Sequence, residues 1–75
     1  MISLSDVCLD KDVRVVNLNV DKNILRRFLD IGLIKGAVIR KVLRSYSGGI
    51  NAYLIMDSIF AIRDKDIKGV MVEYV

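Results

Sequence analysis

The sequence RRFLDIGLIKG, residues 26–36, carries the strongest local signal in the chain. Gly32 stands where the end of a helix favours a left-handed backbone, and Leu33 directly after it can fold back on the last turn. Lys35 and Gly36 then make a tight turn, with the glycine supplying a positive φ. The stretch therefore predicts a helix that ends at Gly32 and a quick return of the chain into its next element.

The helix before this end covers residues 21–31. Asp21 can cap its N-terminus by accepting a hydrogen bond from a free backbone N–H. Its apolar residues fall on one stripe, which is formed by Ile24, Leu25, Phe28 and Leu29. The side chains of Arg26, Arg27 and Asp30 should therefore face water.

Short β-branched runs separated by turn formers surround this helix. We expect five strands, at residues 12–20, 37–43, 50–56, 59–62 and 70–75. The loop SYSGG, residues 45–49, should join two of them as an antiparallel hairpin, and Asp57 with Ser58 should make a second reversal. Residues 1–9 and 63–68 suit single helical turns. The fold class is mainly β, a small barrel of about five antiparallel strands with one helix inserted after the first strand, because closure protects strand edges.

The composition of the 75 residues fits one domain, residues 1–75, with one core. Hydrophobic residues make up 53% of the chain, and the mean hydropathy is high for so short a protein. We therefore expect some apolar surface to remain exposed for a partner, or for a second copy of the chain in a weak homo-oligomer.

Charge and cysteine content point to a cytoplasmic protein. A lone cysteine, Cys8, suits a reducing compartment, and we expect its thiol to be a small buried apolar group. Asp6, Asp10 and Asp12 interrupt any signal peptide at the N-terminus, and no apolar stretch approaches the roughly 20 residues of a membrane span. We expect no membrane insertion.

The residue types exclude most catalytic and metal chemistry. The chain has no histidine, and one cysteine cannot form a tetrahedral thiolate site. Its serines have no histidine base, and Gly48 and Gly49 are not followed by the helix of a phosphate-binding loop. The D-x-D pairs Asp10 with Asp12 and Asp64 with Asp66 fit solvated turns better than a calcium site. We expect a protein that is not an enzyme, with no cofactor and no metal site.

One basic and aromatic cluster leaves two interpretations open. Its residues are Arg40, Lys41, Arg44, Tyr46 and Tyr53. Such residues can stack bases and contact phosphates, or meet an acidic protein surface. A solvated strand face beside a hairpin is the more common reading of the same pattern.

Two blocks of the sequence resemble the ferrous iron transport protein A (FeoA) family, whose fold is an SH3-like barrel. Its members have an Arg-rich helix ending in an aliphatic-Asp-aliphatic-Gly-Leu signature, two spacer residues and a further glycine. The matching residues here are Arg26, Arg27, Phe28, Leu29, Asp30, Ile31, Gly32, Leu33 and Gly36. The second block, IFAIRDKDIKGVMVE, is similar to the family's closing strand pattern at Ala61, Ile62, Arg63, Asp66 and residues 70–73.

The resemblance implies an accessory protein of ferrous iron transport that contacts the cytoplasmic region of FeoB, the GTPase-bearing permease. We place the contact on Arg26, Arg27 and Asp30 of the helix, with Arg44, Tyr46 and Tyr53 of the hairpin. Two alternatives stay open. One is a regulatory module like the SH3-like domain of metal-dependent repressors, and the other is a small nucleic-acid-binding barrel, although we do not expect nucleic acid as the partner.

Overall fold

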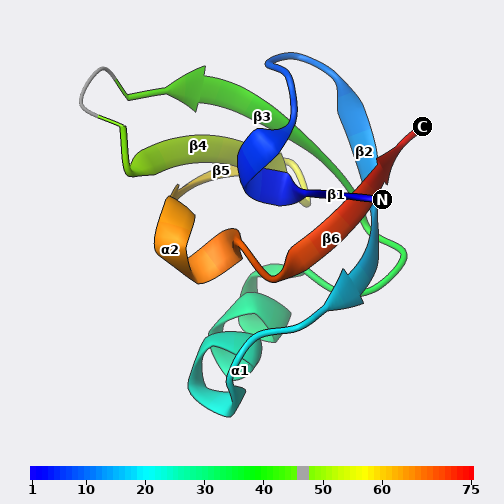
Figure 1. Ribbon diagram of the computed structural model, residues 1–75, viewed down its shortest axis with the longest axis vertical. Coiled ribbons are helices and arrows are strands. Elements are labelled where there is room, and N and C mark those ends of the chain that lie inside the picture. The colour runs from blue at the N-terminus through cyan, green and yellow to red at the C-terminus, as the bar shows by residue number, and fades with distance from the viewer. Residues whose placement is uncertain (46–47) are drawn as a thin grey trace.

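The computed structural model describes residues 1–45 and 48–75, and its strands form one curled antiparallel sheet (Figure 1). The sheet order is β1-β6-β2-β3-β4-β5. The strands are β1 (Ile2–Ser3), β2 (Asp12–Leu18), β3 (Val38–Arg44), β4 (Ile50–Ile55), β5 (Ser58–Arg63) and β6 (Val70–Tyr74). The helices are the 3-10 turn η1 (Leu4–Asp6), α1 (Lys22–Ile31) and the single turn α2 (Asp64–Ile67). Figure 1 shows α1 standing at one end of the sheet.

The prediction of a mainly β fold with one substantial helix is confirmed, but two of its details were wrong. The described residues form six strands, because Ile2 and Ser3 pair with Val72 and Met71 of β6 as the short strand β1. The helix therefore follows the second strand and not the first. A two-residue strand is too short to show an alternating pattern, so only its pairing reveals it.

Apolar side chains from every layer meet in one core. The strands contribute most of it, while Leu4 and Val7 enter from the N-terminal turn, Phe28 and Leu33 from α1 and its end, and Ile67 from α2. All of these are nearly or fully buried. Burial of apolar surface is the main favourable term in folding. The helices therefore stabilise the fold by adding these side chains to the core of the curled sheet.

A bulge in β3 sets which of its side chains enter the core. Ile39 and Lys41 both point inward, as residues two apart in a strand do, and the register to β4 then shifts between Lys41 and Leu43, so that Leu43 is 64% exposed. A bulge places one extra residue in one strand and redirects the side chains that follow it. The strand predicted at residues 37–43 is confirmed as β3, but the sequence did not predict which face Lys41 takes.

The two ends of α1 form as the sequence predicted. The Asp21 Oδ1 atom accepts a hydrogen bond from the Ile24 backbone N–H at 3.0 Å. Gly32 has φ 89°, and the Leu33 N–H donates to the carbonyl oxygen of Phe28 at 2.9 Å. Gly36 also takes a positive φ, 92°. The chain therefore leaves the helix through a left-handed turn that drops Leu33 into the core.

The reversal between β4 and β5 lies one residue earlier than predicted. Met56 and Asp57 are its two turn residues, with φ of 52° and 63°, and Ser58 already pairs with Ile55. Positive φ at both central positions is the geometry of a type I′ hairpin, which matches the twist of the flanking strands. Methionine is unusual in that conformation, which is why the sequence favoured Asp57 and Ser58.

We predict that Gly32→Ala destabilises the fold by on the order of 1 kcal/mol more than Gly36→Ala, as measured by urea unfolding. Both substitutions put alanine at a positive φ, but a Cβ on residue 32 would overlap the Cγ atom of Met56. No atom lies within 4 Å of the corresponding Cβ on residue 36, so Gly36→Ala is the matched control. In a Met56→Ala background the difference should shrink; equal losses in all backgrounds would contradict the packing argument.

Candidate interaction surface

The three helix residues predicted to contact a partner lie together on the outer face of α1. Arg26, Arg27 and Asp30 are all exposed, whereas Phe28 between them is buried. In residues 1–45 and 48–75, neither arginine forms an ion pair or a side-chain hydrogen bond. Their charges are therefore free to meet a partner.

The hairpin residues do not join this helix face. Arg44 is exposed, but it is the last residue of β3. The chain enters β3 from α1 at Val38, and a strand of this length places Arg44 about 20 Å from that point. Tyr53 is fully buried and faces the core, so it does not contribute to any surface. Tyr46 lies outside the described residues. Among the described residues of the predicted surface, Arg26, Arg27 and Asp30 lie together, Arg44 lies apart from them and Tyr53 is buried.

The structure also divides the predicted basic and aromatic cluster. Lys41 is only 2% exposed, and its burial lowers the pKa of its amine. The Arg40 guanidinium donates to Asp12 at 2.8 Å, which raises the pKa of Arg40 and lowers that of Asp12. Only Arg44 remains as an exposed cation without an ion pair in the described part of β3. The expected single basic face was wrong because the inward turn of Lys41 interrupts it.

A groove of about 190 Å³ separates α1 from β5. Arg27, Phe28 and Ile31 line it from the helix, and Phe60, Ala61 and Arg63 line it from the strand. The Arg63 side chain is bound to Asp66 at 3.3 Å, while Arg27 has no such partner among the described residues. The groove therefore has an apolar floor and a positive rim on its helix side.

The strand side of this groove is an open sheet edge. β5 stands last in the sheet order, and among the described residues only β4 pairs with it. Ile55 and Ser58 flank the two-residue turn and exchange backbone hydrogen bonds, as do Tyr53 with Phe60 and Asn51 with Ile62 in the antiparallel alternation. The backbone N–H and C=O groups of Ile59, Ala61 and Arg63 consequently point away from the sheet.

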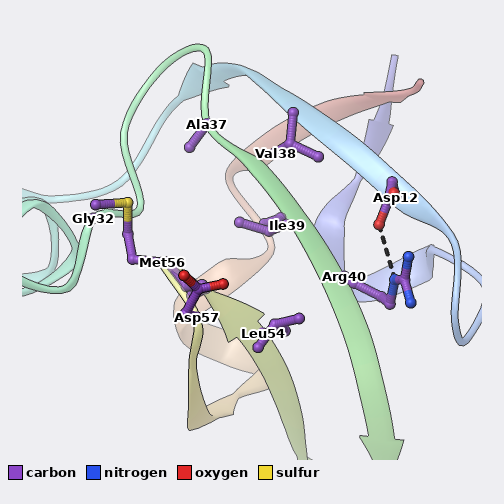
Figure 2. Close-up of a pocket in the computed structure, with 10 residues that line it drawn as sticks. Asp12, Gly32, Ala37, Val38, Ile39, Arg40, Leu54, Met56 and Asp57 are labelled. Carbon is purple, nitrogen blue, oxygen red and sulfur yellow. Dashed lines mark hydrogen bonds and ion pairs between the residues drawn. The ribbon is translucent and has the colours of Figure 1, made fainter.

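A second hollow, of about 240 Å³, lies beside the end of α1 (Figure 2). Figure 2 shows the Met56 side chain reaching over Gly32 at one end and the Arg40–Asp12 ion pair at the other. Val38 and Leu54 lie between them. Met56 is 75% exposed and Val38 is 48% exposed, so apolar surface continues from the helix end onto the hairpin.

We call the combined area the α1–hairpin surface. It comprises the exposed charges of α1, the exposed Met56 side chain beside the end of the helix, and exposed apolar side chains on the helix and on the edge strand β5. Its residues are Arg26, Arg27, Leu29, Asp30, Met56 and Ile59. Sequence reasoning found the charged half but missed Met56 and Ile59, because it placed both in strands, at residues 50–56 and 59–62, where large apolar residues are usually core.

Cys8 is exposed, so the prediction of a buried thiol was wrong. Val7 takes the inward place instead, and the Cys8 backbone N–H donates to the Tyr74 hydroxyl at 3.1 Å. Three of the four aspartates in the two D-x-D pairs bind protein side chains: Asp12 binds Arg40, Asp64 binds Asn51 and Asp66 binds Arg63. Within the described ranges, no three His, Cys, Asp or Glu side chains gather closely enough to hold a metal ion.

The family model for the FeoA domain matches residues 2–74. The chain belongs to the FeoA domain family. Family members are associated with ferrous iron transport and have an SH3-like fold, which confirms the resemblance seen in the sequence and assigns this barrel to that fold. The sequence has no match among curated proteins.

Several solved structures share the fold. Iron(II) transport protein A from Clostridium thermocellum has a TM-score of 0.94 at 20% identity; the alignment covers 99% of this chain and 46% of that one. FeoA from Stenotrophomonas maltophilia, solved with zinc and described as an SH3 domain protein, has a TM-score of 0.83 at 26% identity, covering 97% and 91%. A manganese-dependent transcriptional repressor has a TM-score of 0.88 at 17% identity, covering 99% and 41%.

This FeoA domain chain spans less than half of the Clostridium thermocellum chain that it matches. The zinc of the Stenotrophomonas maltophilia structure has no corresponding ligand cluster among the described residues of this chain. No described helix is long and apolar enough to cross a membrane. The shared property is therefore the barrel, and the α1–hairpin surface is what this chain presents on it.

We predict that Tyr53→Phe protects the fold at alkaline pH. Burial raises the pKa of Tyr53 from 10.0 to about 12, so the unfolded chain loses this proton first and stability falls as pH rises from 10 toward 12. The variant lacks that loss and, because the buried hydroxyl has no hydrogen-bond partner, should cost at most about 1 kcal/mol at neutral pH. Urea unfolding across this pH range measures both effects.

The matched control is Tyr74→Phe, which removes an exposed phenol and keeps Tyr53. This variant should retain the alkaline loss of stability seen in the parent protein. An identical alkaline profile for Tyr53→Phe and the parent would contradict the assignment to Tyr53.

Proposed function

We propose that this protein is a cytoplasmic accessory protein of ferrous iron uptake that binds the cytoplasmic region of a FeoB-type permease through the α1–hairpin surface. The chain belongs to the FeoA domain family, which is associated with ferrous iron transport, and this membership supports a role in ferrous iron uptake. The observation that carries the proposal is Arg27, which has no ion pair among the described residues, at the rim of an apolar groove and an open strand edge, with Arg26 exposed next to it on the helix.

The arrangement suits a partner segment in an extended conformation. Ile59 and Ala61 offer outward backbone groups that a further strand can pair with, which supplies affinity without regard to sequence. The groove floor, with Phe28 and Phe60, accepts apolar side chains of that segment. Arg26 and Arg27 favour acidic residues next to it and speed the encounter by long-range attraction.

The same features argue for binding and not for catalysis. Arg26, Arg27 and Asp30 lie on the open surface of the helix and not inside an enclosed pocket, which is where catalytic groups are usually held. An exposed free thiol at Cys8 is consistent with a reducing compartment, which supports the cytoplasmic assignment. We propose residues 1–75 as one folding unit for this role.

We predict that Arg26→Glu with Arg27→Glu weakens binding to the purified cytoplasmic region of FeoB by roughly tenfold, about 1.4 kcal/mol. Reversing two rim charges converts attraction into repulsion and should mainly slow association. Calorimetric titration gives the affinity, and stopped-flow mixing at several salt concentrations gives the rate.

The matched control is Lys11→Glu with Arg14→Glu. Both residues are exposed, the change in net charge is identical, and they lie on or next to β2, outside the groove between α1 and β5. The control should bind like the parent protein. If both double variants weaken binding equally, the effect comes from net charge and not from the α1–hairpin surface. If the parent protein does not bind at any salt concentration, the proposal is overturned.

A further inference from the structure

The interior of the barrel changes from apolar to polar toward one end. Along the inward face of β3 Ile39 is followed by Lys41, and along that of β4 Asn51 and Tyr53 precede Ile55. Lys41 is 2% exposed, Asn51 is 5% exposed and Tyr53 is fully buried. Lys41 and Asn51 line an open hollow of about 520 Å³ between η1, β3, β4 and the start of α2.

The polar groups of this hollow are only partly satisfied. The Lys41 amine donates to the carbonyl oxygen of Ser5 at 3.0 Å and stands 5.9 Å from the centre of the Tyr53 ring. No carboxylate of the described residues lies within ion-pair distance of it. Lys41 thus brings a buried positive charge to the hollow with two N–H donors unused.

The acceptor side is also incomplete. The Asn51 Nδ2 atom donates to Asp64 Oδ1 at 2.6 Å, but the buried Asn51 Oδ1 atom has no partner, and neither has the Tyr53 hydroxyl. These two groups follow each other on one face of β4 without meeting in hydrogen-bond geometry. The Asp64 carboxylate, by contrast, lines the hollow and keeps acceptor capacity that a guest can use.

Charges at the hollow are balanced between two signs. Lys41 and Arg44 supply two cations, and Asp6 and Asp64 supply two carboxylates. A phosphate dianion would meet repulsion from the carboxylates, and a metal ion would meet repulsion from the cations. A small molecule that carries both charges a few bonds apart satisfies both sets.

We propose that this hollow binds a small zwitterion of the α-amino acid type. Its carboxylate is held by the Lys41 amine and the Arg44 guanidinium, and its ammonium group donates to the carboxylates of Asp6 and Asp64. The volume lies within the range of small-molecule sites, and a few polar groups above an apolar interior are their usual lining. The site is independent of the α1–hairpin surface and of any FeoB contact.

Glycine is the simplest probe, and backbone amide NMR of the whole chain is the measurement. Titration should give saturable shifts at Ser5, Lys41, Asn51 and Asp64. Acetate carries only the carboxylate of glycine, and methylammonium carries only its ammonium group. At matched ionic strength each should bind at least tenfold more weakly than glycine. Shifts of equal size and midpoint with acetate would indicate a simple anion site and overturn the zwitterion.

Three variants separate binding from folding. Lys41→Met removes the buried charge while keeping the chain length, and exposed Arg44→Gln removes the rim cation with little risk to the fold. Each should weaken glycine binding at least tenfold. Arg40→Gln is the control. Arg40 precedes Lys41 in β3, but its side chain binds Asp12 and does not line the hollow, so this variant should bind glycine as the parent protein does.

The decisive outcomes do not depend on a partner protein. Parent protein that shows no saturable shift up to the solubility of glycine would overturn the proposal. So would unchanged binding in Arg44→Gln together with Lys41→Met, which would leave Lys41 a purely structural residue. Neither result would bear on binding to FeoB, whose test uses other variants.

Discussion

The left-handed turn at Gly32 joins the helix to the sheet and fixes how they meet. Its φ of 89° reverses the chain so that Leu33 enters the core immediately after α1 ends. Four residues later the Gly36 N–H donates to the carbonyl oxygen of Val15, and the Val15 N–H donates to that of Ala37, at 2.8 and 2.9 Å. These two bonds begin the pairing of β2 with β3. An L-residue with a Cβ would resist this φ, so the helix end and the register of the sheet depend on the same glycine.

The same turn shapes the surface that we assign to partner binding. Met56 of the β4–β5 hairpin packs over Gly32, where no side chain stands in its way. The helix end and the hairpin are therefore held against each other, with the groove to β5 beside them. A rigid groove bordered by an unpaired strand edge loses little entropy when an extended segment binds. In the binding that we propose, the charges on α1 would add selectivity for acidic partners, although such exposed charges contribute little to the stability of the fold itself.

The barrel has two ends with different chemistry. At the end beside α1, apolar side chains such as Phe28 and Leu33 close the core and leave no buried charge. At the other end Lys41 faces inward from β3 just before the bulge, and Asn51 and Tyr53 face inward from the neighbouring strand. A small domain tolerates such polar groups in its interior only where bonds or a guest satisfy them. This end is consequently the place where a ligand would stabilise the fold that binds it.

The sequence alone determined the features that depend on a few adjacent residues. Asp21, Gly32 and Gly36 act through local backbone geometry, so the limits of α1, the turn after it and the mainly β class were predictable. Tertiary structure decided which way strand side chains face: it buried Lys41 and Tyr53, exposed Cys8 and paired residues 2–3 with the distant β6. The physical reason is that a strand's two faces become different only when other strands pack on one of them, and one bulge exchanges them.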